Sequence, residues 1–233
     1  YEKARIRLPR GVLLFGPPGC GKSFLVPALA KECGFPLITC RGPELLDKYI
    51  GASEAKVREL FARAAAAAPS ILFLDELDSL APRRGSDHTG VTDRVVNQLL
   101  TFLDGVEDTQ RSGTVYIVAA TSRPDKIDAA LLRPGRLEKH IYVGVPDKEE
   151  EWTDLLVKTA SRYNIDDGLI GHLSSGQFIQ EALEQYPFLS EMSPADLKAV
   201  YDAAQVSAAH EALAMDRVED GVPLRLDHLM SAI

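Results

Sequence analysis

Cysteine is scarce in this 233-residue sequence, which holds Cys20, Cys33 and Cys40 and no CxxC pair. An odd and sparse count argues against a disulfide framework and fits reduced thiols in a cytoplasmic setting. Long apolar runs are also missing, since none approaches the roughly 18 residues that a membrane-spanning helix needs. The first residues do not have the pattern of a secretory leader. We therefore expect a cytoplasmic chain without direct membrane insertion.

Basic residues are also fewer than acidic ones. The chain carries 26 lysines and arginines against 34 aspartates and glutamates, a net charge of −8. Nucleic-acid affinity depends on basic side chains that displace counterions from phosphates, so general binding of DNA or RNA is not expected. Residues 1–146 have a net charge of +3 and residues 147–233 one of −11. The acidic part is either an ordinary solvated helical surface or a small domain that docks on the basic part of a neighbouring copy.

The remaining composition, 45% apolar and 26% charged, is that of a globular protein. Short apolar runs predict strands buried on both faces of a parallel sheet. Between these runs, apolar residues recur at helical spacing over 57–64 and 95–103. The alternation predicts an α/β fold with crossover helices. The five predicted strands are residues 12–15, 36–40, 71–74, 115–119 and 140–143.

Strand patterns end near Pro146, and helical patterns follow. Residues 149–160 and 226–233 have apolar positions at helical spacing, and a serine, a proline and an acid over 193–196 are typical of a helix start. The sequence therefore predicts two domains. Residues 1–146 form the larger α/β domain, and residues 147–233 form a small helical domain.

A glycine-rich segment follows the first predicted strand and precedes a helix. Residues 16–23 match G-x-x-x-x-G-K-[ST], a loop whose backbone N–H groups surround phosphates. Lys22 is expected to reach the β- and γ-phosphates of ATP, and Ser23 to ligate Mg²⁺. The predicted nucleotide-binding residues are Gly16, Pro17, Pro18, Gly19, Cys20, Gly21, Lys22 and Ser23.

Two acids end the third predicted strand. Asp75 and Glu76 follow four apolar residues, at the carboxyl end of the strand, where ligands of such sheets bind. Asp75 is expected to hold Mg²⁺ through water, and Glu76 to act as general base on an attacking water. The second acid favours ATP hydrolysis over simple nucleotide binding. The sequence has no NKxD tetrapeptide, which disfavours a small GTPase.

With these two motifs, the segments AATSRPD at 119–125 and LLRPGRL at 131–137 resemble classical AAA+ ATPases over nearly all of residues 9–233. The chain looks most similar to the second ATPase domain of peroxisome-biogenesis members. The resemblance implies a P-loop NTPase domain with a five-stranded parallel sheet, followed by a small α-helical lid. It also implies a hexameric ring with a second AAA+ protein, and places Phe24 and Ala195 at the nucleotide.

The resemblance assigns further roles. Ser122 stands where the family's polar sensor residue, usually Asn, contacts the γ-phosphate or the lytic water. Arg133 and Arg136 match paired arginine fingers that enter the adjacent subunit's site, where a trans arginine supplies roughly 10³–10⁵ in rate. Lys48, Tyr49 and Ile50 match the first pore loop, which grips a polypeptide substrate, and residues 82–92 match the second.

The implied function is an ATP-driven translocase on the cytoplasmic side of the peroxisomal membrane, peripherally attached, which extracts import receptors as part of a heterohexamer. One alternative is a nucleotide-gated assembly scaffold with weak hydrolysis, because Ser122 is shorter than the usual Asn. Another is a p97-like segregase. A DNA-acting clamp loader is disfavoured by the acidic balance and by the aromatic pore-loop residue.

Overall fold

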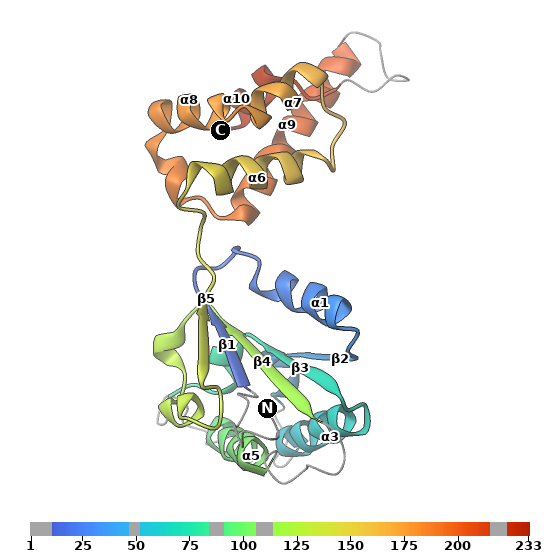
Figure 1. Cartoon of the computed structure of the whole chain (residues 1–233), viewed down its shortest axis with the longest axis vertical. Helices are drawn as coiled ribbons and strands as arrows, with labels where there is room; N and C mark the ends of the chain where they lie inside the picture. The colour runs from blue at the N-terminus through green and yellow to red at the C-terminus, as the bar shows by residue number, and fades with distance from the viewer. Residues whose placement is uncertain (1–10, 47–51, 84–90, 106–113, 215–222) are drawn as a thin grey trace, which may run out of the picture. The chain divides into compact units, whose positions relative to one another are not determined.

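The computed structural model describes residues 11–46, 52–83, 91–105, 114–214 and 223–233. The chain divides into two compact units (Figure 1). The α/β unit contains residues 1–17 and 21–143, and the helical unit contains residues 18–20 and 144–233. Within the described part of the chain, no helix combines the length and the apolar character that a membrane span requires.

Five parallel strands form one sheet in the α/β unit, and the predicted α/β P-loop NTPase fold is confirmed. The strand order is β2-β3-β4-β1-β5, so the strand that precedes the glycine-rich loop lies beside β4. The three central strands, β3, β4 and β1, consist mostly of apolar residues, since helices cover both of their faces. The strands are β1 (Gly11–Phe15), β2 (Leu37–Arg41), β3 (Ser70–Asp75), β4 (Val115–Thr121) and β5 (Lys139–Tyr142).

The expectation of burial on both faces is wrong for the two edge strands. Every residue of β5 is exposed, including Ile141 and Tyr142. In β2 only Ile38 is buried. An apolar run predicts a strand, but the position of that strand in the sheet depends on pairing across the chain, which the run itself does not encode.

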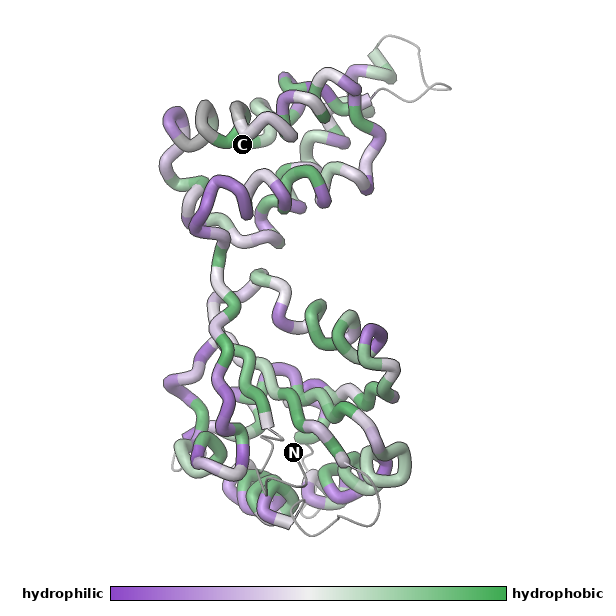
Figure 2. Tube along the Cα trace, viewed as in Figure 1, coloured by the Kyte–Doolittle hydropathy of each residue, from purple (hydrophilic) through white to green (hydrophobic). Residues whose placement is uncertain are grey.

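Helices cover both faces of this sheet, and Figure 1 shows α1 on one side and α3 and α5 on the other. The larger core lies between the sheet and α3, α4 and α5, whereas a smaller core joins α1 to β1, β3 and β4. Figure 2 shows the hydrophobic residues that gather in the central strands. The helices are α1 (Lys22–Cys33), α2 (Gly42–Leu45), α3 (Ala52–Ala66), α4 (Leu77–Leu80) and α5 (Val91–Gly105).

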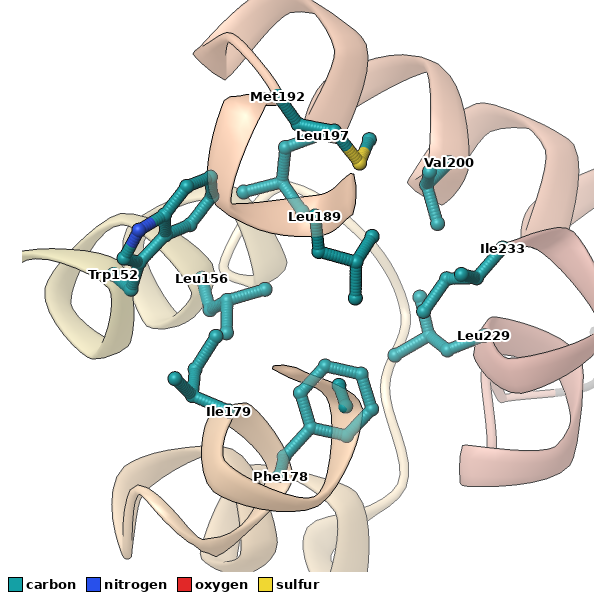
Figure 3. A pocket seen from close by; sticks show the side chains of 11 residues that line it. Trp152, Leu156, Phe178, Ile179, Leu189, Met192, Leu197, Val200, Leu229 and Ile233 are labelled. Atoms are coloured by element: carbon teal, nitrogen blue, oxygen red, sulfur yellow. The ribbon is translucent and has the colours of Figure 1, made fainter. Parts of the chain in front are cut away.

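The helical unit has its own hydrophobic core. At its centre, the buried Tyr201 hydroxyl donates to the carbonyl of Leu156 at 3.2 Å and so ties α9 to α6. Apolar side chains from α6, α8, α9 and α10, with Leu189 of η5, surround a small cavity (Figure 3). The elements are α6 (Glu149–Ala160), α7 (Asp167–Ser174), α8 (Gln177–Gln185), η5 (Pro187–Glu191), α9 (Pro194–Ala214) and α10 (Leu226–Ala232).

Candidate functional site

The glycine-rich loop leaves β1 and leads directly into α1. Gly16, Gly19 and Gly21 have φ values of 148°, 79° and 86°, a region that side chains rarely adopt. A Cβ on Gly16 would also overlap the carbonyl oxygen of Val143. The loop conformation therefore requires glycine at these positions, and its backbone turns back on itself as a phosphate-binding loop does.

Lys22 concentrates positive charge inside this loop. Its Nζ donates to the carbonyl of Gly16 at 2.8 Å and to that of Pro17 at 2.6 Å, and the residue is 7% exposed. The helix start adds partial positive charge, because α1 has no acid in its first turn and Gly21 is its N-cap. A buried ammonium and a helix N-terminus at one loop fit a polyphosphate anion.

Two residues with oxygen groups suited to a magnesium ion follow or end strands at the same edge of the sheet. Ser23 is exposed in the first turn of α1, and Asp75 is the last residue of β3. Among described residues, no three or more histidines, cysteines, aspartates or glutamates are grouped as a metal cage. One hydroxyl and one carboxylate fit Mg²⁺, which commonly completes its shell with substrate phosphates and water.

Glu76 has an unusual backbone. Its φ of 53° and ψ of 48° make it the one non-glycine residue with positive φ among those described. Such a conformation costs of order 1–3 kcal/mol and persists where surrounding contacts impose it. The Ser79 hydroxyl donates to the Glu76 carbonyl at 2.7 Å, and a Cβ on Gly42 would clash with that same oxygen. These contacts hold the backbone of Glu76 in its left-handed conformation.

Strand register places Ser122 between the loop and the two acids. Phe15 of β1 is paired with Thr121 of β4, and Leu74 of β3 with Ala119. β4 lies between β1 and β3, so the residues that follow these three strands meet at one edge of the sheet. Ser122 is exposed and directly follows β4, the strand between the one that leads into the phosphate loop and the one that ends in Asp75.

Thr121 and Asp78 are supporting residues that the sequence interpretation missed. The Thr121 hydroxyl donates to Asp78 Oδ1 at 2.6 Å and accepts from the Arg123 backbone N–H at 3.0 Å. Thr121 is 2% exposed, so water has little access to its hydroxyl, and the bond to Asp78 joins the end of β4 to α4. Their positions in the sequence could have indicated them, because each lies within three residues of a predicted site residue.

Arg133 and Arg136 lie at the opposite edge of the sheet from the phosphate loop. The carbonyl of Arg136 packs against Gly11, where a Cβ would overlap it, and Gly11 is the first residue of β1. The phosphate loop follows the last residue of the same strand, about 13 Å away at about 3.3 Å per residue. The structure therefore does not bring the two arginines to the phosphate loop of their own chain.

The start of α9 carries Ala195, for which a nucleotide contact is predicted. Ser193 and Asp196 form reciprocal hydrogen bonds around this helix start, including Ser193 Oγ to Asp196 Oδ2 at 2.7 Å. These bonds lower the pKa of the Asp196 carboxyl. The backbone N–H of Ala195 donates to the carbonyl of Gly19 at 3.2 Å, and both residues belong to the helical unit, which includes residues 18–20. Phe24 is 71% exposed on α1.

The pore-loop prediction lies outside the described residues. Lys48, Tyr49 and Ile50 belong to the undescribed segment 47–51, and most of the second predicted pore loop belongs to segment 84–90. Both assignments stay predictions.

Comparison of the sequence with known proteins identifies related ATPases. Residues 12–145 match the ATPase family associated with various cellular activities (AAA). The chain is 50% identical over 221 residues to Peroxisomal ATPase PEX1 of Homo sapiens, covering 95% of this chain and 16% of that protein. It is 58% identical over 166 residues to Peroxisomal ATPase pex1 of Schizosaccharomyces pombe, covering 71% and 17%. With PEX1 of Saccharomyces cerevisiae the identity is 46% over 227 residues, covering 96% and 21%.

The chain thus spans between a sixth and about a fifth of the length of these relatives. The family match covers more than half of the chain and includes the phosphate loop, the two acids and the arginine segment. The predicted resemblance to AAA+ ATPases, and to their peroxisome-biogenesis members, is confirmed. The chain belongs to the AAA family of ATPases.

Proposed function

We propose that this domain binds and hydrolyses ATP with Mg²⁺. The observation that carries the proposal is the convergence of three strand ends: the loop with its buried Lys22 after β1, Asp75 and Glu76 after β3, and Ser122 after β4. A cation, a metal-binding carboxylate and a second carboxylate at one sheet edge are the parts that phosphoryl transfer to water requires.

Each residue has a separate task in this mechanism. The N–H groups of residues 16–23 and the ammonium of Lys22 bind the β- and γ-phosphates. Ser23 and Asp75 would hold Mg²⁺, and a bound Mg²⁺ would supply positive charge beside the phosphates. Glu76 orients the attacking water and accepts its proton. Ser122 would contact that water or the γ-phosphate. Phe24 and Ala195 would lie beside the nucleotide. Pro18 and Cys20 belong to the phosphate-binding loop.

An arginine from an adjacent copy completes the site. Arg133 and Arg136 lie at the far edge of their own sheet, and a ring of copies would bring this edge to a neighbour's phosphates. The PEX1 relatives are named as peroxisomal ATPases. As the resemblance to peroxisome-biogenesis members implies, the ring would be a heterohexamer with a peroxin 6-like partner. In this ring, residues 1–146 form the ATPase body and residues 147–233 a lid that moves with the nucleotide state.

The work done by this ring is the extraction of a polypeptide. Lys48, Tyr49 and Ile50 would line the pore, where an aromatic side chain can bury area against any peptide. The relatives are named as peroxisomal ATPases. The resemblance to peroxisome-biogenesis ATPases implies that the substrates would be import receptors and that the ring would be cytoplasmic and peripheral to the peroxisomal membrane.

The substitution Glu76→Gln tests the central claim. It keeps the size of the side chain but removes the proton acceptor, so turnover of the assembled ring should fall about 10²–10⁴-fold. ATP binding, measured by calorimetry, should be retained. Glu59→Gln is a matched control on the exposed surface of α3.

A second function, a nucleotide-gated scaffold, is favoured by one observation. Ser122 is exposed and has a shorter side chain than asparagine, the usual sensor residue of the family. If Glu76→Gln leaves turnover unchanged while ATP still promotes assembly of the ring, the scaffold is correct for this domain and hydrolysis by it is not.

A further inference from the structure

The two arginines of the segment 131–137 have different surroundings. Arg133 is exposed, and its guanidinium takes part in no hydrogen bond or ion pair with the described residues. The side chain of Arg136 is 18% exposed and lies against α5 and η4 (Ala129–Leu132). The guanidinium groups of these two arginines therefore differ in their exposure to solvent and in their hydrogen bonding.

Both edges of the Arg136 guanidinium are in use. Nε and Nη2 donate to the two carboxylate oxygens of Asp104 at 2.7 and 2.8 Å, and Nη1 donates to the carbonyl of Ala130 at 2.5 Å. An arginine grips phosphate through a pair of parallel N–H groups along one edge. Asp104 fills one edge, and Ala130 takes a donor from the other. Arg136 would have to break these bonds to grip a neighbour's phosphate with two donors.

The electrostatics favour the bonded state. The hydrogen bonds from Arg136 hold the pKa of Asp104 below its usual range, and Asp104 raises the pKa of Arg136. Asp104 itself is 56% exposed, and exposed ion pairs add little to global stability. The consequence of this pair is therefore geometric, since a two-pronged contact fixes the orientation of both side chains.

Backbone bonds close the segment around the same point. The N–H of Arg136 donates to the carbonyl of Arg133 at 3.1 Å, and the N–H of Leu137 donates to that of Leu131 at 3.1 Å. Leu131 and Leu137 are buried in the larger core of the α/β unit. Arg133 thus lies in a closed turn whose base is held by two leucines and by Arg136.

We propose that Arg136 is a positioning residue, held by Asp104 and Ala130 so that the turn presents Arg133 alone to the nucleotide of an adjacent copy. The inference rests on the proposed function, because it divides the work of the trans contact between the two arginines. It departs from the expectation of paired fingers. Asp104, which no motif marks, becomes a determinant of turnover at a site that it does not touch.

A double-mutant cycle on the assembled ring of the full-length protein tests this division. Asp104→Asn keeps the shape but loses the charge, so kcat for ATP should fall about 10- to 100-fold, as expected for a misplaced reacting group. KM for ATP should be unchanged, and Asp104→Glu should retain most of the turnover. In an Arg133→Ala background, neither Asp104→Asn nor Arg136→Ala should cause a further loss.

A matched control variant removes a carboxylate elsewhere on the surface. Asp154→Asn removes an exposed carboxylate that pairs with Lys158 and should leave kcat unchanged. If Arg136→Ala lowers kcat by its full separate factor in the Arg133→Ala background, or if Asp104→Asn leaves kcat unchanged or raises it, the inference is overturned while hydrolysis stands. If Arg133→Ala itself has no effect, the trans contact of the proposed function is wrong as well.

Discussion

Lys22 is the residue on which nucleotide binding depends most directly. In the described structure its ammonium bonds to two loop carbonyls, and phosphate oxygens would replace these as its partners. Charged hydrogen bonds contribute about 1.5–3 kcal/mol each, so Lys22→Ala should weaken Mg·ATP binding roughly 10- to 100-fold or more. Isothermal calorimetry measures this. Lys31→Ala, on the exposed end of the same helix, should bind normally.

Thr121 is a residue-scale test of the support beneath the site. Thr121→Val keeps the shape but removes the hydroxyl that bonds Asp78 and the Arg123 N–H. A hydrogen bond contributes about 0.5–1.5 kcal/mol, and somewhat more to a charged group, so the free energy of unfolding should fall by about 1–3 kcal/mol. Denaturant titration measures it. Thr153→Val, at a half-buried position of α6 whose hydroxyl donates to a carbonyl of its own helix, should cost less, and an equal loss would contradict the buried role of Thr121.

At this scale the sequence predicted the residues that lie in contiguous motifs. The phosphate loop and the Asp75–Glu76 pair could be recognised because their chemistry is carried by neighbours along the chain. The bonds of Thr121 to Asp78 and of Arg136 to Asp104 join residues 43 and 32 positions apart. These pairings depend on strand register and helix placement, which are properties of the folded chain.

At the scale of elements, all five predicted strands and the helices over 57–64, 95–103, 149–160 and 226–233 are confirmed within a few residues. The sequence interpretation missed α7, α8 and η5, between residues 161 and 193. This region mixes glycine, proline and polar residues with short apolar stretches. Its helices are eight, nine and five residues long, and helices this short depend on packing in the helical core for their stability.

The tyrosine pair of the helical unit makes an element-scale prediction about pH. Tyr163 and Tyr201 stack with ring centroids 5.2 Å apart, and the Tyr163 hydroxyl donates to Asp202 of α9 at 2.6 Å. Burial first, and then the bond to Asp202, raises the pKa of Tyr163 from 10.0 to about 12. Burial also raises the pKa of Tyr201.

Because the folded state holds these protons more tightly, their stabilisation is complete below pH 10. It is lost as the pH rises through about 12. The midpoint of thermal unfolding of the helical unit should therefore fall over this interval. Tyr163→Phe should make the alkaline decline shallower, whereas Tyr142→Phe, on the exposed edge strand β5, should not. Identical slopes for the wild type and Tyr163→Phe would contradict the assignment.

On the scale of the whole molecule, the parallel sheet separates the two chemical functions of one copy. The phosphate loop is at the carboxyl edge and the Arg133 turn at the amino edge, so one chain cannot supply both to one nucleotide without a neighbour. The charge difference between residues 1–146 and 147–233 is compatible with association of copies and equally with a solvated acidic surface. The position of Arg133 at the amino edge, rather than this charge difference, favours association of copies.

Mixed rings test the consequence of this separation. Arg133→Ala should spare ATP binding by the loop of the same copy but lower hydrolysis in the adjacent copy, by as much as roughly 10³–10⁵-fold for a full arginine finger. Rings that combine Arg133→Ala subunits with Glu76→Gln subunits can be measured by turnover per active site. A site with intact Glu76 beside a mutant arginine should be inactive, whereas the mutant's own site should remain active beside an intact neighbour. Loss confined to the mutant's own site would mean that Arg133 acts within its own chain, against the separation of the sheet edges.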